Sequence, residues 1–262
     1  MKKDCIMRMI VLLLLLFAIN CFAENDEDLN LESYFKNYNG CFVLYDLQKN
    51  ITKRYNAKQC AERLTPCSSF KIANALIGLE TGVLKTSDQI FKWDGKSYPL
   101  NAWNKDLTLK EAMTVSAVPV FQRVAEQIGT ERMKDYLNRF DYGNKDISGG
   151  ISKFWLVSSL KISANEQALF LKKILLNELD VKRKSLNVLL EILDNGRIKC
   201  GHLYGKTGTK MGEGLGLGWF VGFIRTDDGR TFIFASNIES PQSASGLEAK
   251  KIAVNILEDI IK

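Results

Sequence analysis

A hydroxyl and an amine lie three residues apart near the start of a predicted helix. Pro66 precedes Ser68, and the apolar run that follows ends at Gly82, which predicts a capped helix. Ser68 on the first turn and Lys71 three residues later would then share one face of this helix. A neutral lysine amine can take the hydroxyl proton and make the serine a nucleophile. An ordinary serine cap beside a solvated lysine is the alternative, because the S-x-x-K pattern is short.

The only histidine of the chain, His202, limits which base could activate a serine. A Ser-His-Asp triad would have to use it, and no G-x-S-x-G turn presents a serine to it. We expect His202 on the strand that leads to Lys206, so the base of a serine enzyme here is predicted not to be histidine. Scattered cysteines and one histidine also give no zinc framework, and no metal is expected.

The composition suits one or two globular domains with a real core, because 46% of the 262 residues are hydrophobic and 25% are charged. The formal net charge is +6 for the whole chain and a mild +4 without the first 23 residues, which hold three Lys or Arg and one Asp. The sequence has no block of lysine and arginine interleaved with aromatic residues, so nucleic acid is not an expected partner. It carries no signal for an oligomeric state.

The first 23 residues predict a secretory signal peptide. Lys2, Lys3 and Arg8 precede an apolar run over residues 9–19 that is too short to span a bilayer. A pattern of small residues before position 24 predicts cleavage after Ala23. We therefore expect a secreted, periplasmic protein with no stable membrane insertion.

Two alternatives concern cysteines. Cys21 follows the apolar run and could be lipidated, although Asn20 is a poor residue just before a lipidated cysteine. In an exported protein Cys41 and Cys60 are candidates for a disulfide across a short hairpin. The other interpretation is that the four cysteines after the signal are small buried apolar residues, and the sequence favours this one slightly.

The order of the predicted elements defines the fold class. Helices are expected over residues 28–38, 66–82, 108–115, 120–128, 130–140, 163–179, 181–193 and 247–261. Strands are expected over residues 40–46, 51–56, 202–206, 217–225 and 230–237, with loops over 86–105 and 141–162.

This order predicts an α+β fold for residues 24–262. An antiparallel sheet made from both chain ends, residues 24–65 and 197–262, would be flanked by helices. Residues 66–196 would form an all-helical lobe. Ligand pockets often form at the interface between two such lobes, so we expect the site to lie between them.

Four short patterns occur in a characteristic order. They are Ser68-Ser-Phe-Lys71, Ser116-Ala-Val118 at a junction of two helices, Tyr142-Gly-Asn144 in the long loop, and Lys206-Thr-Gly208 on a strand. With Phe154-Trp155-Leu156 and Gly218-Trp-Phe-Val-Gly222, this ordered set resembles the serine β-lactamase and penicillin-binding protein superfamily, class D (oxacillinase type) in particular. The resemblance covers residues 40–237.

The resemblance implies an enzyme that hydrolyses penicillin-type β-lactams through an acyl-enzyme on Ser68 and so confers antibiotic resistance. It implies that Lys71 is N-carboxylated by carbon dioxide, is held by the Trp155 indole N–H, and acts as the general base. Ser116 would relay a proton to the leaving nitrogen. No metal or diffusible cofactor is implied other than carbon dioxide or bicarbonate.

The resemblance also assigns the substrate-binding residues. Lys206 and Thr207 would bind the substrate carboxylate, and the backbone amides of Ser68 and Thr209, beside Gly208, would receive the oxyanion. Val118 would limit water beside the modified lysine. Trp103 is a candidate for the pocket wall, and simple core packing is its alternative, as it is for Trp155. The Tyr142-Gly-Asn144 turn could equally hold its loop without touching substrate.

One departure from the class D pattern concerns the substrate carboxylate. Many members carry an arginine near the start of the terminal helix, and residues 243–251 contain none. Lys206 and Thr207 would then do more of this work, with Ser245 or Lys250 as candidates to assist. A penicillin-sensing domain that is acylated once and a DD-peptidase are the rival functions.

Overall fold

The computed structural model describes residues 26–210, 214–241 and 244–261. The predicted signal peptide, its cleavage site after Ala23 and Cys21 lie outside these residues. Within the described part of the chain, every helix is too short or too polar to cross a bilayer.

The centre of the molecule is a seven-stranded sheet drawn from both chain ends. Its strands are β1 (Asp26–Asp28), β2 (Asn39–Asp46), β3 (Ile51–Tyr55), β6 (Asp194–Ile198), β7 (Gly201–Thr209), β8 (Gly216–Arg225) and β9 (Thr231–Ser240). They lie in the order β1-β3-β2-β9-β8-β7-β6. Neighbours are antiparallel except that β1 adds parallel to β3. The predicted α+β fold is confirmed.

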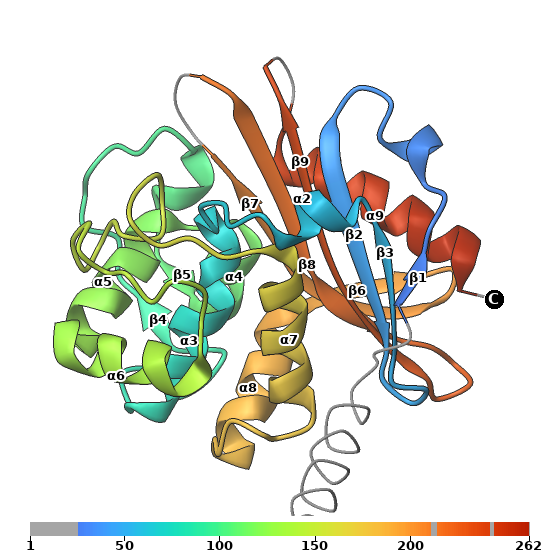
Figure 1. Cartoon of the computed structure of the whole chain (residues 1–262). Helices are drawn as coiled ribbons and strands as arrows, with labels where there is room; N and C mark the ends of the chain where they lie inside the picture. Colours follow the sequence, from blue (N-terminus) through green and yellow to red (C-terminus); the bar gives the residue numbers. More distant parts are fainter. Residues whose placement is uncertain (1–25, 211–213, 242–243, 262) are drawn as a thin grey trace, which may run out of the picture.

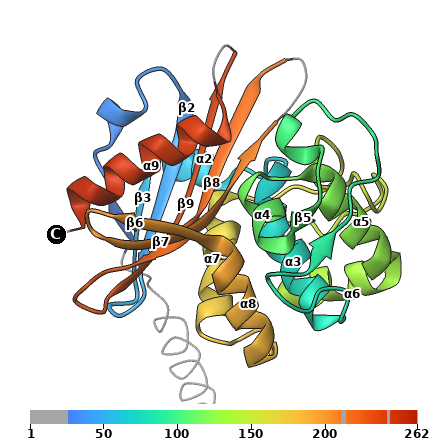
Figure 2. The ribbon, with the colours of Figure 1, turned by 180° about the vertical axis from the view of Figure 1, so that it is seen from behind.

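Helices cover both faces of this sheet. The central strands β8 and β9 are buried along almost their whole length, as strands covered on both faces must be. Figure 2 shows α9 (Gly246–Ile260) lying across one face, and Figure 1 shows α7 (Ala164–Leu175) below the opposite one. Two apolar cores result, a small one under α9 and a larger one under α7 and the helical lobe.

The helical lobe lies to one side of the sheet (Figure 1). Its elements are η3 (Cys67–Phe70), α3 (Lys71–Glu80), η4 (Asn101–Trp103), α4 (Leu109–Thr114), α5 (Val118–Ile128) and α6 (Thr130–Phe140), with the two-stranded sheet β4 (Ile90–Phe91) and β5 (Leu107–Thr108). α8 (Arg183–Leu193) packs against α3, α4 and β7 and so joins the lobe to the sheet.

Local sequence signals explain most helix starts. Thr108 and Ser163 each form the predicted capping box with a glutamate three residues on, which satisfies free backbone donors of α4 and α7. Pro119 lies in the first turn of α5, where its missing N–H costs nothing. These starts place Ser116 in the short connection between α4 and α5, as predicted.

The secondary structure differs from the expectations in several places. The predicted helix over 28–38 is only β1 and a 3-10 turn, η2 (Glu32–Tyr34). There, Leu31 and Phe35 are buried against the sheet, and Phe35 stacks on Tyr55, so tertiary packing overrides the helical pattern. The short helix α2 (Ala57–Ala61), the β4–β5 pair and the edge strand β6 were missed. The helix predicted to reach residue 179 ends as α7 at Leu175.

The four described cysteines have free thiols; Cys41, Cys60 and Cys67 are buried as the buried-hydrophobe interpretation predicts, whereas Cys200 is only partly buried. Cys41 lies in β2 and Cys60 in α2, so the two are not on paired strands of a hairpin. Both are fully buried. Burial is the main cause that raises the pKa of the Cys41 thiol, and the neighbouring Cys60 thiol raises it further.

The small core under α9 should contribute stability without touching the site. Ile256 is fully buried in this core. Ile256→Ala should lower the free energy of unfolding by about 2–5 kcal/mol, because it leaves a cavity between helix and sheet. Urea unfolding monitored by circular dichroism measures this change.

Ile260, on the same helix, is 37% exposed and is the matched control. Ile260→Ala should cost about 1 kcal/mol or less. Equal losses of stability in the two variants would contradict the placement of this core.

Candidate active site

Ser68, Lys71 and Ser116 meet at the start of α3. Ser68 lies in η3, the 3-10 turn that runs directly into α3. Lys71 Nζ is 2.6 Å from Ser68 Oγ and 3.0 Å from Ser116 Oγ. It also donates to the Ser116 carbonyl at 3.1 Å. One amine therefore contacts both hydroxyls, which is an arrangement able to move a proton between them.

Lys71 is the most strongly desolvated cation of this site. Its side chain is fully buried in the apolar core, with Nζ 5.5 Å from the centre of the Phe121 ring. Burial, and second the positive charge of Lys206, hold the pKa of Lys71 well below its usual range. No carboxylate pairs with it in the described part of the chain. These surroundings favour a neutral amine.

Two residues of the site have a left-handed backbone conformation. Cys67 has φ of 50° and Ser116 has φ of 55°. A residue with a Cβ in this region stores of order 1–2 kcal/mol of backbone strain, so the surrounding packing must hold both. Burial raises the pKa of the Cys67 thiol to about 12, which keeps this neighbour of Ser68 protonated and a poor nucleophile.

The end of β7 forms the wall of the site opposite the helical lobe. A Cβ added to Gly208 would stand 2.8 Å from the Pro66 carbonyl oxygen and 3.0 Å from the Ser69 nitrogen. Only glycine lets this strand approach the turn that carries Ser68 so closely. The Thr209 hydroxyl accepts from the Gly246 N–H at 2.8 Å, which fixes the strand end to the start of α9.

Lys206, in β7, is the second buried cation of the site. It is 4% exposed, and its amine donates to the Thr207 carbonyl at 3.0 Å. Burial, and next the charge of Lys250, lower the pKa of Lys206 to about 7. An anionic group bound in the cleft would favour the charged form of this amine.

An open cleft of about 680 Å³ lies between these walls. Of the predicted site residues it is lined by Ser68, Trp103, Ser116, Val118, Thr207 and Thr209. Lys71, Trp155, Lys206 and Gly208 lie behind its surface. Its rim also holds the apolar side chains of Leu100, Val157 and Leu247, which are 46%, 54% and 76% exposed. Sequence reasoning missed these three, because a single exposed leucine or valine in a loop gives no local signal.

Trp155 is fully buried and its indole N–H has no acceptor. The N–H groups of Trp93, Trp103 and Trp219 all donate to backbone carbonyls. Trp155 stacks on Phe70, the residue just before Lys71, with ring centres 5.4 Å apart. A buried donor without a partner is costly, so this N–H fits an acceptor group that the protein side chains themselves do not supply.

The Tyr142-Gly-Asn144 turn supports the site from behind and does not line the cleft. Tyr142 is buried, and its hydroxyl lies 3.3 Å from Gln167 Oε1. Gln167 in turn donates to Ser69 Oγ at 2.7 Å, and Asn144 donates to the Ser159 carbonyl. The structure thus agrees with the loop-holding interpretation. Gln167 was not predicted, because nothing local marks a helical glutamine as buried.

The remaining candidates lie away from the cleft surface. Lys250 is half-buried and donates to Asn195 Oδ1 at 2.6 Å, and the Ser245 hydroxyl caps α9. His202 lies in β7 as expected and pairs with Asp194 at 2.7 Å. The described residues contain no group of three or more His, Cys, Asp or Glu side chains that could ligate a metal.

Comparison with known proteins identifies relatives along most of the chain. The family described as the penicillin binding protein transpeptidase domain matches residues 40–261. The probable beta-lactamase YbxI of Bacillus subtilis is 43% identical over 234 residues, which cover 89% of this chain and 85% of that protein.

Two solved structures are similar in fold. The class D beta-lactamase BAT-2 delta mutant has a TM-score of 0.83 and 41% identity, and the match covers 89% of this chain and 97% of that one. The C-terminal domain of the Bacillus licheniformis BlaR penicillin-receptor has a TM-score of 0.86 and 35% identity, with coverage of 91% and 97%.

The contact between Gly208 and the η3 turn should control the reactivity of Ser68. Gly208→Ala would push β7 away from Pro66 and displace the wall that faces the hydroxyl. A shift of this kind costs about 100-fold in rate. The measurement is the rate at which a fluorophosphonate probe labels Ser68, followed by intact mass.

Gly229→Ala is the control, because Gly229 lies in a turn with φ of 85° and open space around its Cβ position. This variant should lose about 1 kcal/mol of stability through backbone strain and keep its labelling rate. Parental labelling of Gly208→Ala would refute the role of the contact.

Proposed function

The chain belongs to the class D serine β-lactamases, and we propose that it hydrolyses penicillin-type antibiotics through an ester on Ser68. The observation that carries this proposal is the position of Lys71 Nζ, 2.6 Å from Ser68 Oγ and 3.0 Å from Ser116 Oγ, in a fully buried environment. A neutral base in contact with a hydroxyl is what a serine nucleophile needs.

Acylation transfers the β-lactam carbonyl to Ser68. The Ser68 Oγ–H bond breaks toward Lys71 as Oγ attacks the carbonyl carbon, and the ring C–N bond then breaks. Ser116, in contact with Lys71, delivers a proton to the departing nitrogen. Attack of a water molecule on the resulting ester releases the ring-opened acid and restores the serine hydroxyl.

The walls of the cleft bind the rest of the substrate. The backbone N–H groups of Ser68 and Thr209 would stabilise the oxyanion, and Gly208 lets their two segments approach closely. Lys206 and Thr207 would hold the substrate carboxylate. Trp103 would form the side of the pocket, and the exposed rim at Leu100, Val157 and Leu247 suits an apolar substituent on the substrate.

A carbamate formed by carbon dioxide on Lys71 fits the residues present. A neutral amine is the form that adds carbon dioxide, and the orphaned Trp155 N–H is a suitable donor for a carbamate oxygen. Once formed, this group would replace the free amine as the general base, both for acylation and for activating the water that deacylates Ser68. Val118, on the cleft surface, would limit the entry of water.

The proposed enzyme acts in the periplasm and confers antibiotic resistance. Secretion to the periplasm after cleavage at Ala23 would put the enzyme in the path of incoming antibiotic, and hydrolysis there would give resistance. Turnover also separates this function from that of a penicillin sensor, which the similarity to the BlaR receptor domain keeps as the second candidate.

Mixing the protein with excess nitrocefin distinguishes the two candidates. We expect continuous hydrolysis over many turnovers, and none in Ser68→Ala. A single stoichiometric burst, with the protein left acylated, would support the sensor function and contradict the hydrolase.

Removal of the Trp155 indole N–H should slow deacylation more than acylation. Trp155→Phe keeps a buried ring but removes the donor, so the modified lysine would lose its partner. Deacylation should fall about 100-fold, and acyl-enzyme should accumulate in intact-mass spectra during turnover. Added bicarbonate should partly restore the rate.

Trp219→Phe is the matched control, because Trp219 is equally buried but its indole donates to the Thr65 carbonyl at 2.9 Å. It should cost stability and leave deacylation within a few fold. Turnover of Trp155→Phe that does not respond to bicarbonate would count against the carbamate.

Lys206 should set an alkaline limit on substrate capture. Its amine, with a pKa lowered to about 7, is charged below that pH and attracts the carboxylate, and this attraction fades as the pH rises. The value of kcat/KM for benzylpenicillin, which reports the free enzyme, should therefore fall above about pH 7.

Lys206→Arg keeps its charge throughout this range and should shift the fall to higher pH. A substrate whose carboxylate is methyl-esterified should show no such fall with the parental protein. An unchanged alkaline limb in both experiments would exclude Lys206 as its origin.

A further inference from the structure

A second cavity lies near the end of β8 that is farther from the substrate cleft. The cleft is lined by Thr207 and Thr209, which pair with Phe220 and Gly218, whereas the cavity is lined by Phe223 and Arg225. It has a volume of about 380 Å³ and is bounded by α7, α8 and the end of β8. This volume falls within the range of roughly 300–1,000 Å³ that small-molecule sites occupy. None of its lining residues belongs to the cleft, so the proposed β-lactam reaction does not use it.

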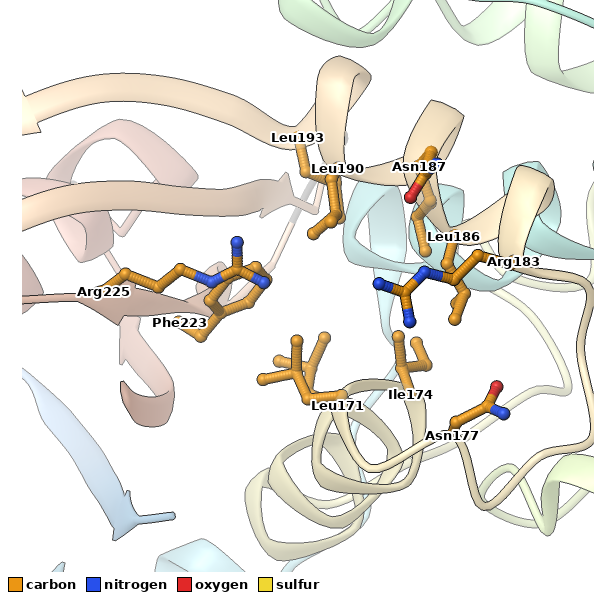
Figure 3. Close-up of a pocket in the computed structure, with 12 residues that line it drawn as sticks. Leu171, Ile174, Asn177, Arg183, Leu186, Asn187, Leu190, Leu193, Phe223 and Arg225 are labelled. Carbon is orange, nitrogen blue, oxygen red and sulfur yellow. The ribbon is translucent and has the colours of Figure 1, made fainter. Parts of the chain in front are cut away.

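The floor of this cavity is apolar. Leu171 and Ile174 of α7 face Leu190 and Leu193 of α8, and Phe223 of β8 forms one end (Figure 3). Four of these five side chains are at most 4% exposed and belong to the large core, and Leu190 is partly buried against it. A floor of this kind binds an unbranched alkyl chain by removing it from water.

Two arginines point into the same space. Figure 3 shows the guanidinium groups of Arg183, at the start of α8, and Arg225, at the end of β8, directed into the cavity from opposite sides. The Arg225 group lies 5.6 Å from the ring centres of Tyr204 and Phe223, which hold it in place. Both side chains are exposed, so a ligand can reach them.

Neither guanidinium has a carboxylate partner within the described ranges of the chain. The cavity lining contains no aspartate or glutamate, and its other polar side chains are Asn177 and Asn187. By contrast, Arg197 nearby on β6 pairs with Asp227 at 2.7 Å. Two like charges that face one apolar space without a counter-ion favour an anion between them.

We propose that this cavity binds a monocarboxylate with an unbranched alkyl chain, the chemistry of a medium-chain fatty acid. The carboxylate lies between Arg183 and Arg225, where guanidinium groups can bind it in a bidentate way. The alkyl chain lies over the leucines of α7 and α8. This site is independent of Ser68 and of the reaction proposed there.

Calorimetric titration of the protein with octanoate tests the proposal. We expect one site per chain, with an affinity that rises about fourfold for each added methylene from hexanoate to decanoate. Arg183→Gln and Arg225→Gln should each weaken octanoate binding about tenfold, because a charged hydrogen bond is lost. Both residues are exposed, so neither variant should disturb folding.

Three controls make the result specific. Arg197→Gln should bind octanoate like the parental protein, because that guanidinium is paired outside the cavity. Octanol and octylammonium should bind at least tenfold more weakly than octanoate. Octanoate at saturation should not compete with nitrocefin for the cleft.

Several results would overturn the site. These are no measurable binding of octanoate, parental affinity in the Arg183→Gln/Arg225→Gln double variant, or octylammonium binding as tightly as octanoate. Competitive inhibition of nitrocefin hydrolysis with an inhibition constant equal to the octanoate dissociation constant would place the fatty acid in the substrate cleft and would also refute the proposal.

Discussion

The structure depends on the burial of one amine. Lys71 has no exposed surface, no carboxylate partner within the described residues, and two hydroxyls within 3.0 Å of its nitrogen. The free-energy cost of burying a charged lysine in such surroundings is high, and that of burying a neutral lysine is low. The same desolvation that lowers the pKa of this amine makes it a base for Ser68 and a candidate for carboxylation.

The rest of the fold maintains this burial while leaving the hydroxyl accessible. The large core closes around α3 from the side of α5 and α8, and strained backbone at Cys67 and Ser116 turns both reactive segments toward the cleft. Gly208 brings the sheet to the same point. The site therefore lies where the helical lobe meets the sheet, and each lobe supplies one wall.

The sequence predicted the fold class and the residues that meet in the site, because both follow from patterns. The order of strands and helices defines a sheet made from both chain ends, and the S-x-x-K spacing puts Ser68 and Lys71 on one helical face. The features that were mispredicted or missed depend on contacts between segments that are distant in the sequence. Leu31 and Phe35 have helical spacing, but they are held by contacts with the sheet. The buried bond from Gln167 to Ser69 spans 98 residues, and the rim at Leu247 forms only where its helix meets the loops that carry Leu100 and Val157. The cavity between Arg183 and Arg225 joins two elements that share no sequence pattern.

The most direct test of the central claim is ¹³C NMR of the protein equilibrated with ¹³C-bicarbonate. A buried neutral amine at position 71 predicts a single slowly exchanging carbamate resonance at neutral pH, which disappears on acidification and is absent from Lys71→Ala. If no such resonance forms at saturating bicarbonate, or if it persists in Lys71→Ala, the account of Lys71 as a desolvated, reactive base is contradicted.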